Sequence, residues 1–286
     1  MAITINTNIA ALNAQRRLGQ TTKGLSRSFE RLSSGLRIVR ASDDAAGLAI
    51  ADSLKADQRI AGVAIRNAND GVSLISIADG ALSEMGNVLS RMAELAEQSA
   101  NGTLSSTQRS ALSSEFVALA SEIERIAVTT EFNGLSLLSG GGQVALQIGF
   151  DSQSTSQISF SGVEGTLASL GLANSGSSAL VFSLNASTTA GGQAASQAAL
   201  DAVKGAISSL TTNRGTLGAT ESRLNVTINN LQVARENFAA AESQIRDVDV
   251  ASEAAELTRL NILQQAGAAV LAQANQQPAL ALALLG

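Results

Sequence analysis

A heptad repeat in the last third of the chain restricts its fold more than any other feature of the sequence. Apolar residues recur every seven positions without a gap, at Val203, Leu210, Leu217, Leu224, Leu231, Phe238 and Ile245. This spacing is typical of a long helix that packs one apolar stripe against a neighbouring helix. At 1.5 Å per residue, such a helix would be about 63 Å long. Gly215 lies inside it and, because glycine disfavours helix, allows a local break there.

The rest of the chain carries further stripes in which spacings of four and three residues alternate. They run through Leu25, Phe29, Leu32, Leu36 and Val39, through Val72, Ile75, Ala78, Leu82, Met85, Leu89 and Met92, and through Leu112, Phe116, Leu119, Ile123 and Ile126. Near the C-terminus, Leu260, Leu263, Val270 and Ala274 resume the pattern. Asn101-Gly102 is expected to stop the second helix, and Ser105 with Gln108 predicts a capping box for the third. The periodicities predict a mainly α protein, a long coiled-coil-like helical bundle formed by the N- and C-terminal regions.

The middle of the chain has a different character. Between Leu137 and Leu200 the charged residues are Asp151 and Glu164 alone, and Gly, Ser and Thr are abundant. Apolar residues alternate with polar or small ones at Val144, Leu146, Ile148 and Phe150, and again at Ile158 and Phe160. Because a polar turn separates the two runs, they predict a small β-hairpin. Residues 174–193 are expected to form an outer strand-and-loop region.

The composition excludes most catalytic chemistry. The 286 residues include no Cys, His, Trp or Tyr, so the chain has no thiolate nucleophile, no imidazole base and no ordinary zinc ligand set. The three consecutive glycines at 140–142 lack the lysine of a phosphate-binding loop, and no acidic cluster has the spacing of a metal loop. We therefore predict no catalytic residue, no metal site and no cofactor, and expect that the protein is not an enzyme.

Charge and hydropathy also restrict the partners. The net charge of −5 argues against nucleic acid as a partner. No uninterrupted apolar run reaches the roughly 18 residues that a membrane-spanning helix needs, so we expect no membrane insertion. The two ends have opposite signs, because residues 1–40 carry a net charge of +6 and residues 236–286 one of −4. This predicts that the terminal helices meet, within one subunit or between neighbours; the alternative is two separate solvated faces.

Five segments of the sequence carry the motifs of one known family. They are NTNIAALNAQRRL (Asn6–Leu18), the long run Arg31–Leu82, LSRMAELAEQSANGT (Leu89–Thr103), FNG (Phe132–Gly134) and ILQQAGAAVLAQANQ (Ile262–Gln276). Together they resemble bacterial flagellin. The similar regions cover residues 1–140 and 195–286, about four-fifths of the chain. Since the central interval is short, the chain resembles a short flagellin with a minimal central region.

The resemblance implies a structural subunit that self-assembles into the hollow helical filament of the bacterial flagellum and serves motility. It implies secretion through the flagellar type III export apparatus and an extracellular location. Residues 1–44 and 246–286 would pair as an inner coiled-coil layer that lines the channel. Residues 45–140 and 196–245 would form the surrounding helical layer, and residues 141–195 the β-hairpin and outer loops.

Contacts between copies should be spread over many residues. The best candidates are the apolar residues Ile5, Ile9, Leu12, Leu263, Val270, Leu284 and Leu285. The alternative is that these residues fold back into an intramolecular core. By resemblance, the partners besides the chain itself are an export chaperone that masks Ile262–Leu285, and the hook-junction and cap proteins of the flagellum.

Two shorter motifs allow a functional or a structural interpretation. Relatives that stimulate the animal innate receptor for flagellin carry a basic-x-basic-acid-Leu pattern in the second helical region. Arg91, Glu94 and Leu95 match that pattern, but Ala93 stands where the second basic residue is expected. Lateral contact between subunits therefore explains these residues as well as recognition by the receptor does. In the Arg40–Asp44 segment, Ser42 or Asp43 is expected to cap the following helix.

Three other classes of protein are alternatives to the filament subunit. A hook–filament junction protein shares the terminal helices of flagellin but departs from the terminal motifs matched above. A surface adhesin or carbohydrate-binding module would use the hairpin region, where aromatic residues for sugar stacking are nearly absent. Nothing in the sequence supports the third class, an enzyme.

Overall fold

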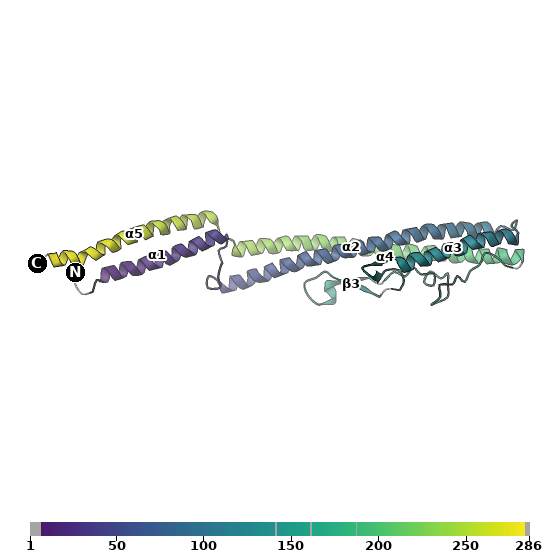
Figure 1. Ribbon diagram of the computed structural model, residues 1–286, viewed down its shortest axis with the longest axis horizontal. Coiled ribbons are helices and arrows are strands. Elements are labelled where there is room, and N and C mark those ends of the chain that lie inside the picture. Colours follow the sequence, from purple (N-terminus) through teal and green to yellow (C-terminus); the bar gives the residue numbers. More distant parts are fainter. Residues whose placement is uncertain (1–6, 141, 161, 187, 284–286) are drawn as a thin grey trace. The chain divides into compact units, whose positions relative to one another are not determined.

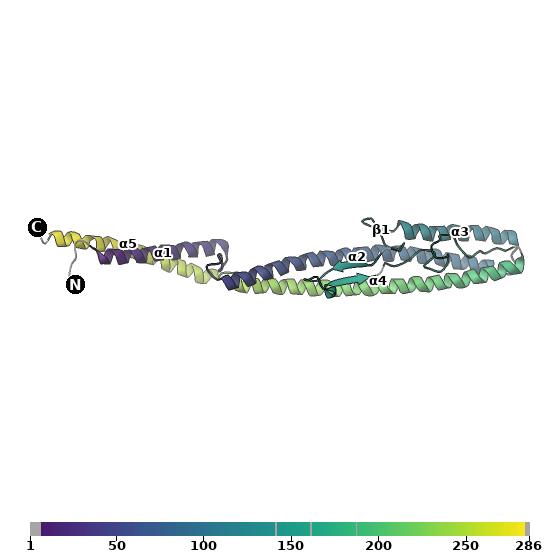
Figure 2. The same ribbon diagram turned by 90° about the horizontal axis from the view of Figure 1, so that it is seen from below.

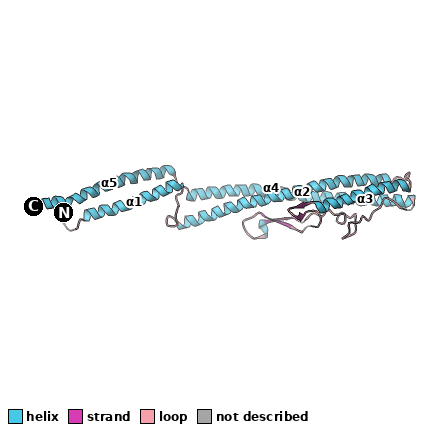
Figure 3. Ribbon diagram, in the orientation of Figure 1, coloured by secondary structure: helices cyan, strands magenta, loops and turns pink. Residues whose placement is uncertain are grey.

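The computed structural model describes residues 7–140, 142–160, 162–186 and 188–283, with side chains described up to Gln276 (Figure 1). These residues form five α-helices: α1 (Ile9–Ser34), α2 (Ala45–Ser99), α3 (Ser106–Thr129), α4 (Thr189–Arg246) and α5 (Val250–Ala283). They also form two antiparallel two-stranded sheets, β1 (Glu131–Phe132) with β2 (Leu135–Ser136) and β3 (Val144–Gln147) with β4 (Gln157–Phe160). Figure 3 shows how strongly helix dominates. The predicted fold class, mainly α with a small central hairpin, is confirmed.

The chain divides into two compact units. The terminal unit contains the chain up to Gln58 and from Glu236 onward, and the central unit contains Arg59–Arg235. Helices α2 and α4 contribute residues to both units. Each unit is described by itself below.

In the terminal unit, α1 and α5 pack side by side and antiparallel (Figures 1 and 2). The Nδ2 of Asn8 donates to the Ala274 carbonyl at 2.7 Å, and Ser28 Oγ lies 3.5 Å from the Glu253 carbonyl at the opposite end. The residues of α5 that turn toward α1 are half-buried or buried and recur with heptad spacing: Leu257, Leu260, Gln264, Gly267, Leu271 and Ala274. On α1 the matching residues are Ala11, Ala14, Leu18, Thr21, Leu25 and Ser28.

The predicted apolar stripe of α5 divides between two faces. Leu260 and Ala274 face α1, but Leu263 and Val270 are 44% and 59% exposed. Gly267 lies in the seam beside Leu18, where a Cβ would meet Leu18 Cδ1 at 3.4 Å, an ordinary van der Waals distance. The seam thus includes a small residue that apolarity alone does not indicate.

Helix α1 ends earlier than its apolar stripe predicts. Gly35 has a left-handed backbone (φ 73°), and its N–H donates to the Arg31 carbonyl at 2.8 Å, which terminates the helix. Leu36 and Val39 therefore lie beyond α1, and their assignment to it was wrong. Leu36 instead pairs with Asp247 in an antiparallel bridge. The connection from α1 to α2 is thus joined by backbone hydrogen bonds to the connection from α4 to α5.

The cap of α2 is also not the predicted one. Asp44, rather than Ser42 or Asp43, accepts the hydrogen bond from the N–H of Gly47, at 2.9 Å. Asp43 points back into the preceding turn, where its Oδ2 accepts from the Arg40 N–H at 3.1 Å. That hydrogen bond is the main cause that holds the pKa of Asp43 below its ordinary value.

The core of the central unit lies between α2, α3 and α4, along the predicted stripes. Leu82, Met85, Leu89 and Met92 of α2, Phe116 and Ile123 of α3, and Val203, Leu210, Leu217 and Leu224 of α4 are almost fully buried. The capping box of Ser105 and Gln108 is confirmed. The break near Gly215 is not found, because α4 is continuous. Burial of the stripe outweighs the cost of about 1 kcal/mol that a helical glycine carries.

The predicted hairpin is confirmed, with Leu146 opposite Ile158. A short 3₁₀ turn at Ser154–Ser156 precedes β4. The hairpin is fixed to α2, since Asn67 Nδ2 donates to the Gln147 carbonyl at 2.9 Å. A second hairpin, β1–β2, was not predicted. It turns through Asn133 (φ 50°) and Gly134 (φ 77°), and two central residues with positive φ are typical of a type I′ turn.

The segment between β4 and α4 folds back onto the core. Leu167, Leu170, Leu172 and Leu184 are at most 4% exposed. The Leu167 N–H donates to Glu124 Oε2 at 2.9 Å. Part of the stretch 174–193 is thus interior, and α4 already begins at Thr189, before the first residue of its heptad stripe.

Candidate functional site

The terminal unit keeps a row of large apolar side chains in contact with solvent. Ile9 and Leu12 on α1 are 58% and 56% exposed, and Leu263 and Val270 on α5 are 44% and 59% exposed. Within the described residues, none of the four lies in the seam between α1 and α5. The other three predicted contact residues, Ile5, Leu284 and Leu285, lie outside the described residues.

A shallow groove of about 320 Å³ runs along this surface. Leu263 and Val270 line it from α5, and Leu18 and Arg17 line it from α1. Most of its lining residues are apolar or small, and Arg17 is the one charged residue among them. It brings two of the predicted contact residues together on one surface that both terminal helices form.

Several further members of this exposed set were not predicted from the sequence. Phe29 on α1, Ile50 on α2, and Val250 and Ile262 on α5 are each more than 50% exposed. The sequence does indicate a second apolar face, because α5 has more apolar positions than contact with one neighbouring helix requires. A helix with two apolar faces has more than one partner surface.

The opposite charges of the two ends do not explain the pairing of α1 with α5. The helices meet, as predicted, but few of their charges do. Of the basic side chains in the first forty residues, Arg31 alone has an ion pair with an acid beyond residue 236 among the described residues, at 3.9 Å from Glu253. Exposed pairs of this kind contribute about 0–1 kcal/mol.

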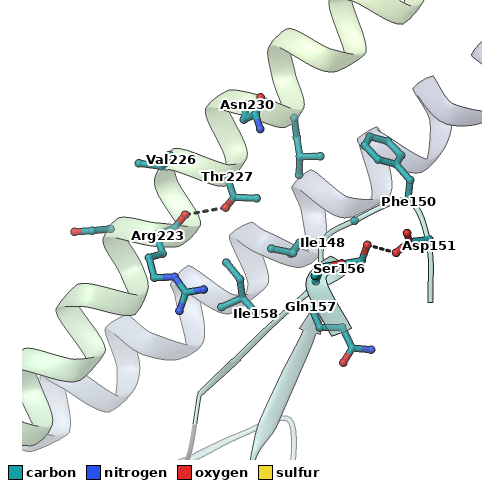
Figure 4. A pocket seen from close by; sticks show the side chains of 14 residues that line it. Ile148, Phe150, Asp151, Ser156, Gln157, Ile158, Arg223, Val226, Thr227 and Asn230 are labelled. Carbon is teal, nitrogen blue, oxygen red and sulfur yellow. Dashed lines mark hydrogen bonds between the residues drawn. The ribbon is translucent and has the colours of Figure 1, made fainter. Parts of the chain in front are cut away.

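The central unit has a groove of about 650 Å³ between the β3–β4 hairpin and α4 (Figure 4). Ile148 and Phe150 line it from the hairpin side, and Arg223 and Val226 from α4. Val226 is 69% exposed, the highest exposure among the large apolar residues of the structure's described part. Asp151 accepts a hydrogen bond from Ser156 at its edge. Apolar and polar groups mix in the groove without a nucleophile, a base or a convergent ligand set.

The possible receptor motif lies on α2 beside α3. Arg91 Nη1 contacts Glu94 Oε2 at 2.9 Å, and Arg91 Nη2 contacts Glu115 Oε1 of α3, also at 2.9 Å. The two glutamates and the arginine are exposed, whereas Leu95 is 1% exposed in the core. Glu115 joins the cluster from another helix, so sequence spacing did not indicate it.

A buried arginine fixes the end of the central unit. Arg109 of α3 is fully buried, and its three guanidinium nitrogens donate to the carbonyls of Ser99, Asn101 and Thr189 at 2.9, 2.9 and 3.0 Å. These carbonyls belong to the end of α2, the following turn and the start of α4. Because helix C-termini carry partial negative charge, the guanidinium is stabilised there without a carboxylate partner. Beside it, Ser196 Oγ lies 2.8 Å from Ser99 Oγ.

Two negative findings concern the described part of the chain. It contains no group of three or more His, Cys, Asp or Glu side chains close enough to hold a metal ion. None of its helices combines the length and apolarity needed to cross a membrane.

Comparisons with known proteins decide what kind of molecule this surface belongs to. The family model described as the bacterial flagellin N-terminal helical region matches residues 5–143, and that of the flagellin C-terminal helical region matches residues 200–285. The chain belongs to the bacterial flagellin family. It is 45% identical over 281 residues to the flagellin of Halalkalibacterium halodurans, covering 98% of this chain and 99% of that protein. It is 43% identical over 305 residues to the flagellin of Bacillus subtilis, again covering 98% and 99%.

Membership in this family settles the main predictions. The protein is a structural subunit of the extracellular flagellar filament that serves motility, and not an enzyme. The fold is shared more widely. A solved structure from Vibrio parahaemolyticus described as flagellar hook-associated is 15% identical, with a TM-score of 0.57, and covers 72% of this chain and 100% of its own. Since that likeness shows the fold alone, the flagellin relatives distinguish the filament subunit from a junction protein.

Proposed function

We propose that copies of this chain join through the exposed apolar surface of the paired helices α1 and α5. The observation that carries the proposal is that pairing leaves Ile9, Leu12, Leu263 and Val270 between 44% and 59% exposed. The predicted contacts of Ile5, Leu284 and Leu285 belong to the same proposal. Burying an apolar side chain of this size stabilises by about 1.5–3 kcal/mol.

This surface fits a polymer better than a closed dimer. Its exposed apolar residues lie at different positions along the helix axes and come from both helices. A heterologous contact, in which different patches of two copies meet, continues into a helical filament when the rotation does not close. Further members, such as Ile262 and Phe29, extend the surface around the helix pair.

The proposal includes a division into layers. Residues 1–44 and 246–286 would form the inner coiled-coil layer, and residues 45–140 and 196–245 the surrounding helical layer. Residues 141–195, with the hairpin and the loops, would belong to the outer part. The pairing of α1 with α5 supports the inner layer, because a helix pair with additional apolar faces is suited to packing among its own copies.

A trimmed chain tests the proposal. A chain that lacks about forty residues at each end should fail to elongate sheared filament seeds, whereas the full chain should elongate them, because the trimmed chain has lost α1 and α5. Electron microscopy of both mixtures provides the measurement. Circular dichroism of the trimmed chain serves as the control that the central unit still folds. Equal elongation by both chains, or no filament from the full chain, would overturn the proposal.

We propose that the other partners use the same termini. The export chaperone would mask Ile262–Leu285, where Ile262 is 61% exposed. The hook-junction and cap proteins would contact the α1–α5 surface at the two ends of the filament. The trimmed chain should therefore also fail to bind the chaperone in a pull-down.

We propose that Arg91 and Glu94 contact neighbouring subunits laterally rather than the animal receptor. Ala93 lacks the charge expected of the receptor motif, and the burial of Leu95 leaves it unable to reach a partner. Changing Arg91 to Glu should raise the soluble concentration left after polymerisation by about tenfold, since it reverses the charge that this side chain presents to a neighbouring copy. Sedimentation measures this, with Arg125→Glu as an exposed control on α3. Strong receptor stimulation by the native chain in a reporter cell assay would contradict the assignment.

A further inference from the structure

The charged side chains of the terminal unit are segregated along its length. The end near the chain termini, residues 7–27 and 257–283, carries five basic side chains and no acidic one. The end near the two connections, residues 28–58 and 236–256, carries five basic and eleven acidic side chains. Their net charges are therefore +5 and −6. We call them the basic end and the acidic end.

The basic residues that α1 contributes to the basic end are not neutralised within their own chain, whereas Arg259 of α5 pairs with Glu256 across the boundary between the two ends. Arg16, Arg17, Lys23 and Arg27 of α1 are exposed, and none of them has an ion pair among the described residues. The segment of α5 that packs against them from Leu257 onward contains Arg259 but no acid. Arg16 contacts the uncharged Asn13 instead, at 3.1 Å. Four like charges on one short helical segment repel each other and favour an anionic partner surface.

The acidic end keeps an excess of negative charge, and several of its basic side chains already form ion pairs with acids of the same end. Arg40 pairs with Glu30 at 2.8 Å, Lys55 with Glu242 at 3.9 Å and Arg246 with Asp52 at 3.3 Å. All of these pairs form inside the acidic end. Asp57 and Glu236 take part in no ion pair among the residues that the structure describes.

We propose that neighbouring copies in the filament are shifted along the helices so that the basic end of one terminal unit lies beside the acidic end of the next. The inference rests on the proposed function, since it assumes that the terminal units are the polymer contact. An apolar surface alone is not directional and allows the copies to slide along one another. Placing like ends together would set +5 against +5 and −6 against −6, so complementary charge selects the shifted register.

The shift follows from the dimensions of the helices. Helix α1 has 26 residues and is about 39 Å long at 1.5 Å per residue. The basic side chains occupy the middle of α1, whereas the acidic excess begins near its C-terminal end and continues beyond it. A displacement of between half and the whole length of α1 therefore brings the opposite charges side by side, within the screening length of about 8–10 Å at moderate salt.

A charge swap tests this arrangement. One variant carries Arg16→Glu, Arg17→Glu and Lys23→Glu, and a second carries Asp57→Lys, Glu236→Lys and Asp247→Lys. Each should raise the soluble concentration left after polymerisation by about tenfold or more, because it places like charges beside each other at every contact. The combined variant should polymerise nearly as well as the native chain. It restores opposite charges between copies and has the native net charge of −5.

The controls separate this contact from effects of net charge and of folding. The substitutions Arg59→Glu, Arg66→Glu and Lys204→Glu change the net charge of the central unit by as much as the first variant changes that of the terminal unit. These three residues are exposed, and this control should polymerise like the native chain. Lys, Arg and Glu have similar helix propensities, so circular dichroism should show equal helicity for every monomer.

The outcomes distinguish the proposals. If each one-sided variant polymerises like the native chain, or if the combined variant is as impaired as they are, the shifted register is overturned while the proposed function stands. The same holds if the net-charge control is equally impaired. If the native chain itself forms no filament, the proposed function fails, and the shifted register fails with it.

Discussion

Changing Leu263 and Val270 to Gln should raise the chain concentration required for filament growth by about thirtyfold to a hundredfold. The two side chains are 44% and 59% exposed in the isolated chain and are proposed to be buried between copies. Each substitution removes apolar area that would be buried between copies, which costs about 1–1.5 kcal/mol of association free energy per residue. Every 1.4 kcal/mol is a factor of ten in the required concentration. Sedimentation of the polymer at increasing total concentration measures the soluble fraction directly.

The prediction is specific because these positions do not support the fold of one chain. Glutamine is a good helix former, and neither residue lies in the seam with α1, so the helicity of the monomer should not change. The α1 counterpart, Ile9→Gln with Leu12→Gln, should behave in the same way. Val181→Gln is the matched control, since Val181 is 52% exposed but lies in the loop between β4 and α4. The idea fails if the α5 pair polymerises like this control.

The helical core could be predicted from the sequence because its stripes are long and have one partner. Leu82, Met85, Leu89 and Met92 recur with a regular spacing and are all fully buried. The same reasoning holds for the heptad stripe of α4 up to Leu231. Where an apolar period runs for several turns, burial inside the chain is the arrangement that removes most apolar surface from water.

The packing of the terminal helices could not be predicted in the same way. Some of their apolar residues pack within the chain, and others are proposed to contact neighbouring copies. The periodicity groups Leu263 and Val270 with Leu260 and Ala274, whereas Gln264 and Gly267 lie in the seam with α1. Hydropathy ranks glutamine and glycine low, so it does not place them there. In a polymer subunit, apolar residues form contacts between copies as well as contacts within one chain.

Local backbone chemistry accounts for the remaining differences. The left-handed conformation of Gly35 ends α1 although its apolar spacing continues to Val39. Asn133-Gly134 forms the turn of a hairpin that was not predicted. In both cases the glycine was visible in the sequence. Whether such a glycine ends a helix or forms a hairpin turn depends on which segment lies close enough to pair with the chain. The spacing of apolar residues does not show which segment that is.

Changing Arg109 to Met should destabilise the central unit by about 3 kcal/mol or more. The substitution removes three hydrogen bonds and leaves the buried carbonyl of Ser99 and the partly buried carbonyls of Asn101 and Thr189 without their donor. An unsatisfied buried polar group costs about 1–3 kcal/mol, and hydrogen bonds to a charged group are the stronger kind. Urea unfolding of the full chain, followed by circular dichroism, should show the loss in the transition of the central unit.

Arg125→Met is the matched control, because Arg125 lies on the same helix with an exposed side chain paired to Glu122. Its loss should cost no more than about 1 kcal/mol. Arg109→Lys should fall between the two, since an ammonium keeps the charge but cannot reach three carbonyls with the fixed fork of a guanidinium. Equal destabilisation by Arg109→Met and Arg125→Met would mean that the buried hydrogen bonds do not join α2, α3 and α4. A full rescue by lysine would assign the effect to charge rather than to geometry.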